Sequence, residues 1–274
     1  MEDFRVSSWN ELNDVLAEGS WDERIGRRRS RFAFRGTGDD AADLRTSLAR
    51  LGGRYASVER NLLRNFRKYA ERHAGRRDSD WSWLALAQHH GLPTRLLDWS
   101  YSPLVAAHFA TVNTERYERD GAIWCANFVE THRHLPHTLR TILRDEGSEV
   151  FTVELLEQAT DGVAEFDRLA ADPFAVFVEP PSLDDRILGQ WGLFSVMSDA
   201  EARFDAWLDD RPDVTARRVL IPADLKWEIR DRLDMIGINE RTLFPGLDGL
   251  SRWLARYYAP RSERLRRFRS TEAG

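Results

Sequence analysis

The sequence predicts an α+β fold in which a helix-rich domain surrounds a small mixed or antiparallel sheet. Five or six short strand patterns alternate irregularly with helical patterns and form no regular βαβ units. Neither GxGxxG nor GxxxxGK(S/T) occurs, which argues against a Rossmann or P-loop nucleotide site. With 42% hydrophobic residues and ten tryptophans, the 274 residues can bury a sizeable core, in one large domain or two small ones.

Composition and charge narrow the class of protein. The chain has 31% charged residues, a net charge of −5 and a mean hydropathy of −0.53, and no run approaches the ~20 apolar residues of a membrane span. The N-terminus lacks the apolar segment of a signal peptide, and the single cysteine, Cys125, excludes an internal disulfide. Because Cys125 lies in an apolar run, we interpret it as a buried thiol without a catalytic role. These features predict a cytoplasmic protein that does not enter a membrane.

Residues 1–30 contain a predicted helix followed by an arginine-rich loop. Ser8 and Glu11 have capping-box spacing, and Leu12 and Leu16 follow at helical intervals. The elements predicted after the loop are a strand at 31–35, helices at 57–72 and 81–89, a strand at 94–99, a helix at 104–111 and a strand at 121–130. Residues 131–172 carry helical patterns at 151–158 and 162–170, and we interpret them as a helical insertion.

The second half of the chain continues the irregular alternation. Its predicted elements are strands at 174–179, 193–197 and 219–222, a helix capped by Asp199, and helices at 225–236 and 247–257. We expect residues 31–258 to form the main domain and residues 259–274 a basic tail. His132, His134 and His137 cluster in the insertion, but no cysteine or close carboxylate accompanies them, so we expect no metal site.

One stretch, residues 84–110 (LALAQHHGLPTRLLDWSYSPLVAAHFA), is denser in reactive side chains than any other. Asp80 is predicted to cap the helix before it, and Gly91 to end that helix in a left-handed conformation. Ser100 or Ser102 caps the next helix, which begins at Pro103 and whose free N–H groups attract phosphate. Two helix ends and the turn between them thus gather a polar set, namely Gln88, His89, His90, Thr94, Arg95, Asp98 and Ser100.

An alternative interpretation makes this polar set structural. Arg95 would then pair with Asp98 to fix the turn, and His89 and His90 would simply end a helix.

The strand at 31–35 places Phe32 and Phe34 on one face and Arg35 on the other. Phe34 is expected to anchor the strand in the core while Arg35 faces a cleft, and Gly36 permits a sharp turn or the close approach of a ligand. The Arg35 guanidinium could hold a phosphate or ribose, or form a salt bridge with a carboxylate such as Glu59. These alternatives are compatible, since a carboxylate can hold the guanidinium in place.

These motifs resemble the FRG domain, a family named for an aromatic-Arg-Gly motif. Here that motif is Phe34-Arg35-Gly36, and QHHGLPTRLLDWSYSPLVAAHFA at 88–110 resembles the family signature. Glu59, PPSLDDRILGQWGLFSV at 180–196 and GINERTLFPGLDGL at 237–250 also match, so the resemblance spans about residues 30–255. The family is largely defined by sequence, so membership implies little about activity.

The domain also resembles, more distantly, the ADP-ribosyltransferase layout, a comparison at the level of the fold. In that superfamily the Arg of an aromatic-Arg-Gly motif on the first strand binds NAD. A second motif joins a strand ending in small hydroxyl residues to a helix with Ala and Phe, and residues 97–110 are similar. A third places a Glu or Gln on a later strand, a position that Gln190 or Glu179 could fill, although no ExE or QxE pair is present.

The resemblance implies NAD as the suspected cofactor and two sets of site residues. Arg35 and the helix start near Ser102 suit a pyrophosphate, and Trp99 or Tyr101 could stack on the nicotinamide ring. The residues expected in catalysis are His89, His90, Asp98 and Gln190. The residues expected to bind the nucleotide are Arg35, Gly36, Gln88, Thr94, Arg95, Trp99, Ser100, Ser102 and Arg186.

Two functions from different classes follow. The first is an NAD-dependent ADP-ribosyltransferase or NAD-cleaving enzyme that acts on a protein or nucleic acid, in a toxin-like or phage-defence role. The second is a non-catalytic module that binds a nucleotide or nucleic acid, with the arginine clusters at 24–31 and 261–269 as its basic surfaces. A simpler alternative treats these arginines as solvated faces, since the net charge is acidic.

Overall fold

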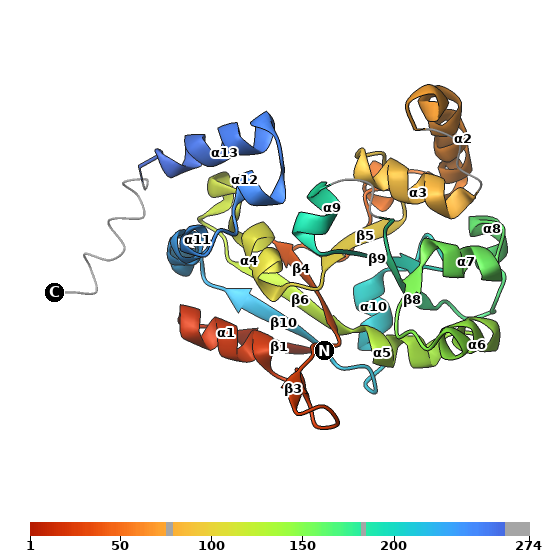
Figure 1. Cartoon of the computed structure of the whole chain (residues 1–274), viewed down its shortest axis with the longest axis horizontal. Helices are drawn as coiled ribbons and strands as arrows, with labels where there is room; N and C mark the ends of the chain where they lie inside the picture. The colour runs from red at the N-terminus through yellow and green to blue at the C-terminus, as the bar shows by residue number, and fades with distance from the viewer. Residues whose placement is uncertain (75–78, 182–184, 261–274) are drawn as a thin grey trace.

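A computed structural model describes residues 1–74, 79–181 and 185–260 of the chain. Within them one open mixed sheet has the strand order β1-β10-β6-β4-β5-β9-β8-β7 (Figure 1). The edge strands β1 and β7 run parallel to their neighbours, and the other adjacent pairs are antiparallel. In sheet order the strands are Glu2–Arg5, Ala216–Ile221, Gly121–Asn127, Phe32–Thr37, Leu96–Ser100, Gly192–Met197, Ala175–Glu179 and Phe151–Thr152.

The predicted α+β class is therefore confirmed, with a sheet larger than the strand patterns indicated. The additional strands are β1, β7 and a separate hairpin of β2 (Trp21–Asp22) and β3 (Arg27–Arg28). Each is two to four residues long, which is too short for an alternation of apolar and polar residues to be visible in the sequence. The helices that accompany the sheet are α1 (Trp9–Ala17), α2 (Tyr55–Ala74), α3 (Asp80–His89), α4 (Pro103–Thr111), α5 (Phe128–Thr131), α6 (His137–Glu146), α7 (Val153–Ala159), α8 (Val163–Phe166), α9 (Asp185–Gln190), α10 (Phe204–Asp209), α11 (Lys226–Met235), α12 (Glu240–Leu243) and α13 (Leu247–Tyr257).

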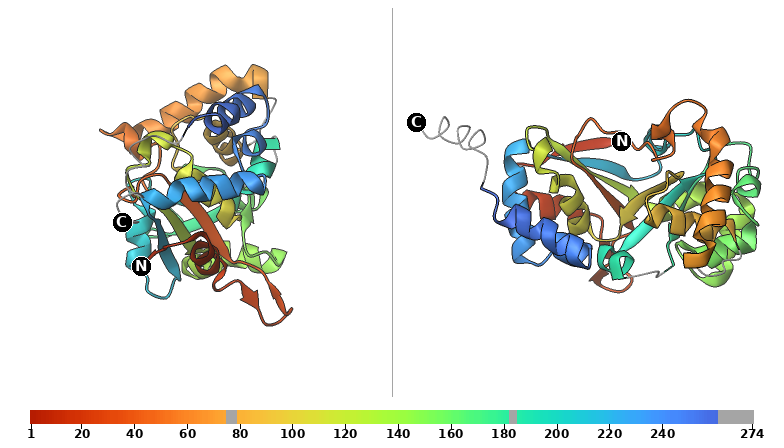
Figure 2. Two further views of the ribbon diagram at one scale, coloured as in Figure 1. Left: turned by 90° about the vertical axis from the view of Figure 1, so that its left-hand side faces the viewer. Right: turned by 90° about the horizontal axis from the view of Figure 1, so that it is seen from above.

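The two faces of the sheet are covered differently. On one face a single core, which includes Trp124, Phe177 and Phe204, runs from β6 to β8 beneath α10. On the other face the core has two parts. Helices α1, α4 and α11 cover the half of the sheet that contains β4, and helices α2, α3, α6, α7 and α8 cover the half that contains β5. Figures 1 and 2 show these two groups of helices over opposite ends of the sheet, so the centre of this face lies between two separate cores.

The ends of the helices follow local sequence rules with one correction. The Ser8 hydroxyl caps α1 by accepting from the Glu11 N–H at 3.2 Å, and Gly91 adopts a φ of +78° after α3, both as predicted. The cap of α3 is Ser79 and not Asp80, which is the first helical residue and pairs with Arg67 of α2. An acidic side chain at the first helical residue interacts favourably with the positive end of the helix dipole, although it does not accept the capping hydrogen bond.

Residues 131–172 form α5 to α8 and β7, which joins the edge of the sheet. The strand predicted to reach residue 130 stops at Asn127, because the Asn127 side chain accepts from the N–H groups of Val129 and Glu130 and begins α5. His132 is buried with Nδ1 2.9 Å from the Glu149 carbonyl oxygen, and its Nε2 accepts from a backbone N–H. The residues described contain no group of three metal-ligating side chains.

Three further sequence expectations concern membrane spans, Cys125 and the basic clusters. No described helix combines the length and apolar character needed to cross a bilayer. The Cys125 thiol is buried in the core, as predicted, and burial raises its pKa to about 12. Of the two arginine clusters, residues 24–31 include the short strand β3 of the β2–β3 hairpin, whereas residues 261–269 lie outside the described residues.

Candidate functional site

The sheet is split between its two central strands. β4 pairs with β6 along its whole length and β5 pairs with β9 along its whole length, but β4 and β5 share only the pair Phe34–Ser100. The two strands therefore diverge, and a cavity of about 260 Å³ opens beside them. The residues that line it are Phe34, Arg35, Gly36, Gln88, His89, Asp98, Trp99, Ser100, Phe109, Pro180, Arg186, Ile187, Gln190, Gly192 and Phe194.

This cavity brings together nine of the thirteen site residues predicted from the sequence. Arg35 and the polar corner at residues 88–100 lie on opposite sides of the divergence, in segments more than fifty residues apart in the chain. Arg186 and Gln190 come from a third segment, the short helix α9, about ninety residues further along. We refer to this cavity as the central cleft.

Arg35 is the charged side chain at the split. It is half-buried, and its Nη1 donates to the Asp98 carbonyl oxygen, while its buried Nε has no hydrogen-bond partner among the described residues. Burial lowers the pKa of the guanidinium below its usual value, Asp98 partly opposes this shift, and Arg50 adds to it. The group remains a cation near neutral pH, since an Arg side chain starts from a pKa above 12. A buried cation with an unused donor is costly unless an anion or water satisfies it, which makes this position favourable for an anionic group.

A chain of hydrogen bonds fixes the polar corner opposite Arg35. The Thr94 hydroxyl donates to Gln88 Oε1 at 2.5 Å, and Gln88 Nε2 donates to Asp98 Oδ2 at 2.9 Å. The Asp98 carboxylate is therefore held in place and exposed to the cleft. Thr94 itself is buried and does not line the cleft, so it orients Gln88 from behind.

The helix α9 and the turn after it close one side of the cleft. The Ser100 hydroxyl donates to the Gln190 carbonyl at 2.7 Å, and the Tyr101 N–H donates to the Trp191 carbonyl at 3.0 Å. Trp191 adopts a φ of +50°, the single positive value for a non-glycine residue in the described ranges. Such backbone conformations cost free energy and concentrate at functional sites. The strain is thus localised at the residue that directly follows Gln190.

Two side chains of α9 also tie this helix to the segment around α12. Gln190 Nε2 donates to the Leu243 carbonyl at 2.9 Å, and the Arg186 guanidinium lies 5.0 Å above the Phe244 ring. The position of α9, and with it the width of the cleft, therefore depends on α12.

Gly36 has a role other than the turn or ligand approach expected from the sequence. A Cβ at this position would lie 1.9 Å from the Ala106 carbonyl oxygen and 2.6 Å from the Ala110 nitrogen. Only a glycine therefore permits β4 and α4 to contact each other this closely. The same contact brings Phe109 of α4 into the cleft, half-buried and edge-on to Phe244 at 6.1 Å. Sequence analysis missed Phe109, whose only signal was its place on the alanine-rich helix.

The two aromatic residues proposed for ring stacking are engaged elsewhere. Trp99 Nε1 donates to Ser195 Oγ at 2.8 Å, and the buried ring packs edge-to-face on Phe177 and Phe204. Trp99 is thus a core residue although it borders the cleft, because odd-numbered residues of β5 point to the continuous core. Tyr101 does not line the cleft, and its hydroxyl donates to Glu179 at 2.7 Å. We therefore retain neither residue as a stacking group.

Arg95 is a second departure from the sequence interpretation. Its guanidinium is 5% exposed and binds the carboxylates of Glu59 and Asp167, not the Asp98 carboxylate proposed as its partner. Glu59 is thereby also unavailable to Arg35. Arg95 and Asp98 diverge because Arg95 precedes β5 and turns beneath α2, whereas Asp98 lies at the split.

Ser102 and His90 also lie outside the central cleft. The Ser102 hydroxyl caps α4 by accepting from the Val105 N–H, with Pro103 as the first helical residue, as predicted. His90 is the exposed residue that ends α3, which fits the alternative that made it an ordinary helix end. His89 remains at the edge of the cleft.

The fold and the cleft together define an α+β protein whose mixed sheet divides at a half-buried arginine. Residues 30–119 match the family model of the FRG domain, and the match covers both Phe34-Arg35-Gly36 and the stretch at 88–110. The chain therefore carries an FRG domain, as the motifs indicated. No curated protein and no solved structure matches the chain. The extent of the domain to residue 258 stays a prediction.

Proposed function

We propose that the central cleft binds a nucleotide, and that this nucleotide is NAD. The observation that carries the proposal is the Arg35 guanidinium, a half-buried cation with an unused Nε donor at the point where β4 and β5 diverge. A phosphate oxygen would satisfy that donor and offset the cost of burying the charge. Phe109 and Phe194 supply apolar and aromatic surface in the same cleft, which suits a base or nicotinamide ring.

The size of the cleft limits how such a ligand would lie. About 260 Å³ is slightly below the roughly 300–1,000 Å³ usual for small-molecule sites, so it would enclose only part of a dinucleotide. The remainder would lie along the opening, where Asp98 is exposed. Arg35 fits the pyrophosphate in this arrangement, and Gln88 and Gln190 are the amides within the cleft that suit ribose hydroxyl groups.

The reaction that fits these residues is cleavage of the nicotinamide–ribose bond, followed by transfer of ADP-ribose or by hydrolysis. That bond cleavage builds positive charge on the ribose, which a fixed carboxylate such as Asp98 would stabilise. His89, at the edge of the cleft, is the imidazole placed to act as a general base. A protein or nucleic-acid acceptor, a cytoplasmic location and a toxin-like or defence role belong to the same proposal.

The test compares wild-type protein with Arg35→Ala. We expect wild type to bind NAD and release nicotinamide, measured by calorimetry and chromatography, and Arg35→Ala to bind about 10–150-fold more weakly, because about 1.5–3 kcal/mol of charged hydrogen bonding is lost. Arg144→Ala is a matched control, since Arg144 is exposed and its guanidinium pairs with the adjacent Asp145. Unchanged affinity in folded Arg35→Ala protein would contradict the role of Arg35.

Two further outcomes separate the parts of the proposal. NAD binding without nicotinamide release would leave the non-catalytic nucleotide-binding module as the function. If Arg35→Ala fails to fold, Arg35→Lys keeps the charge and removes the bidentate geometry, so unchanged affinity in that folded variant would show that the planar guanidinium is not what holds the phosphate. Wild-type protein that binds neither NAD nor ADP-ribose would refute the nucleotide proposal itself.

A further inference from the structure

The helix α2 and the loop before it form a strongly basic segment within an acidic protein. Residues 50–72 contain seven arginine or lysine residues and only two acidic residues, although the whole chain has a net charge of −5. The rest of the chain therefore carries a more negative net charge than the chain as a whole. Neither the FRG match nor the central cleft explains this concentration of positive charge.

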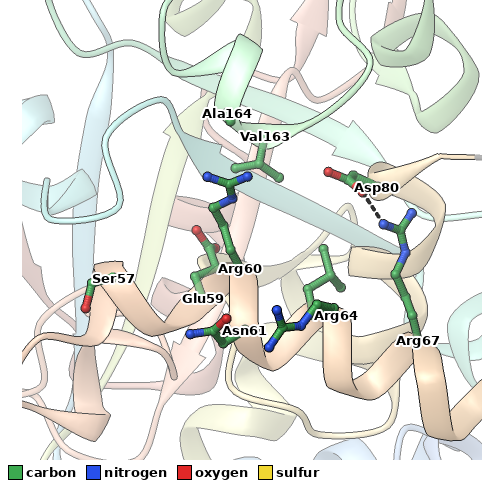
Figure 3. A pocket seen from close by; sticks show the side chains of 10 residues that line it. Ser57, Glu59, Arg60, Asn61, Arg64, Arg67, Asp80, Val163 and Ala164 are labelled. Atoms are coloured by element: carbon green, nitrogen blue, oxygen red, sulfur yellow. Dashed lines mark ion pairs between the residues drawn. The ribbon is translucent and has the colours of Figure 1, made fainter.

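A groove of about 470 Å³ runs along α2 where it faces α3 and α8. Its charged and polar lining includes Arg60, Asn61, Arg64 and Arg67, all from one stretch of the helix. Figure 3 shows Arg67 turned to Asp80 and Arg60 extended toward α8. Helical rise places Arg60 and Arg64 about 6 Å apart along the axis, and Arg67 about 5 Å further on. We refer to this feature as the arginine groove.

Most of the negative charge near the arginine groove is already neutralised. Asp80 pairs with Arg67 at 2.6 Å, and the buried Glu59 carboxylate is held by Arg95. Arg60 and Arg64 are exposed, and neither has an ion-pair or hydrogen-bond partner in the part of the chain that the structure describes. Two guanidinium groups are thus available on the wall of a hollow, four residues apart on one helix face.

We propose that the arginine groove binds the phosphodiester backbone of a single-stranded nucleic acid. A row of guanidinium groups suits successive phosphates, since each planar fork can bind two phosphate oxygens. The basic residues continue past the groove on both sides, with Arg54 before it and Lys68 and Arg72 after it. A compact anion would need only the central pair, whereas a polymer uses the whole row.

The position of the arginine groove relates it to the central cleft. Arg50, at the beginning of the basic segment, is close enough to lower the pKa of Arg35 in the cleft. Figure 1 shows α2, α3 and α9 along the same side of the sheet. A nucleic-acid strand bound along α2 would therefore lie on the same side of the sheet as α3 and α9, both of which line the cleft. The binding of nucleic acid does not require that the cleft bind NAD.

The test uses fluorescence anisotropy with a labelled, unpaired RNA of about 20 nucleotides and a DNA of the same sequence. Phosphate contacts from Arg60, Arg64 and one flanking basic residue predict a slope of log K against log salt near −2 for a single strand, which means a loss of roughly 20-fold in affinity between about 50 and 200 mM salt. Arg60→Ala/Arg64→Ala should bring the slope close to −0.7, because about 0.7 is lost with each contact.

The matched control is Arg140→Ala/Arg144→Ala on α6. Arg140 and Arg144 are also exposed and four residues apart, so both double variants change the net charge equally. The control should leave affinity within about twofold of wild type. An equal loss in both double variants would reduce the effect to total charge and overturn the proposal. The proposal would also be overturned if the wild-type protein failed to bind RNA or DNA at low salt. A third contrary result would be complete displacement of the nucleic acid by inorganic phosphate at constant ionic strength.

Arg35→Ala separates this inference from the proposed function. It should retain the RNA affinity of wild type while losing NAD affinity. The two proposals can thus fail independently.

Discussion

Replacement of Arg95 by alanine tests whether this residue stabilises the fold as part of a buried ion cluster or belongs to the binding site. Arg95 Nε donates to Glu59 Oε1 at 2.8 Å, and Arg95 Nη2 donates to Asp167 Oδ2 at 3.1 Å. Burial tends to lower the pKa of Arg95, but Glu59 and Asp167 more than offset this and raise it. Burial also raises the pKa of Asp167 despite the opposing effect of Arg95. The cluster thus holds two carboxylates with one cation, and removal of the cation leaves both uncompensated.

The expected loss of stability follows from the burial of the Arg95 ion pairs. The loss of one partner of a buried ion pair costs about 3–5 kcal/mol, which for a domain of this size lowers Tm by about 6–20 °C. Arg67→Ala provides the control, because Arg67 and Asp80 are each about one-third exposed. Such a pair contributes about 0–1 kcal/mol. The same substitution should thus have very different effects at two arginines that both contact a carboxylate.

The assay is urea denaturation at pH 7 followed by tryptophan fluorescence, with a double-mutant cycle for Arg95→Ala and Glu59→Ala. The double variant should be more stable than the sum of the two single losses implies, since it removes a buried charge together with its partner. The reasoning is refuted if Arg95→Ala costs less than about 1 kcal/mol, or if Arg67→Ala costs as much. A stable Arg95→Ala protein that lost NAD affinity would instead return Arg95 to the binding site.

Two further predictions concern packing and pH. Gly36→Ala should destabilise the protein by about 1–3 kcal/mol, because the new Cβ would force β4 and α4 apart. The control is Gly26→Ala, since no atom lies within 4 Å of a Cβ at that position. In thermal denaturation it should cost less stability than Gly36→Ala, despite the φ of +62° at Gly26. A Gly36→Ala variant as stable as wild type would show that α4 moves freely. Burial lowers the pKa of His108 to about 3 and of His132 to about 4, so both remain neutral in the folded protein where unfolded histidine gains a proton. Their contribution to the free energy of unfolding is fully present above about pH 6.5 and is lost as the pH falls. We expect a loss of about 2 kcal/mol between pH 6 and 5. Urea midpoints that do not change over that interval would contradict this prediction.

Local signals in the sequence were sufficient for most of the fold. Alternation of Phe32 and Phe34 with Arg35 indicated β4 and its direction, and Ser102 with Pro103 indicated the start of α4. The edge strands were not predictable, because β1 and β7 depend on pairing with β10 and β8 from distant parts of the chain. Cap identity also failed by one residue at α3, where both Ser79 and Asp80 have side chains suited to the position.

The candidate site was predictable only as a set of residue types. The charge and hydrogen-bonding capacity of Arg35, Gln88 and Asp98 marked them as site residues before their geometry was known. Nothing local distinguished Arg95 from Arg35, because the direction of Arg95 is set by carboxylates 36 and 72 residues away. Tertiary partners of this kind decide whether an arginine stabilises the fold or faces a ligand.

The single pair between β4 and β5 explains why the site lies where it does. A sheet that continued its ladder past Phe34 and Ser100 would bring the two cores of this face together and would leave no space for polar side chains. The divergence instead leaves the Asp98 carbonyl to accept from Arg35, and the Ser100 hydroxyl to hold the turn at Gln190. The Arg35–Asp98 bond joins the two halves of the molecule across the split, whereas the Ser100–Gln190 bond lies within the half that contains β5 and β9. A ligand bound to Arg35 and Gln190 would therefore bridge the same two halves, so the strength of its binding depends on how rigidly the split is held.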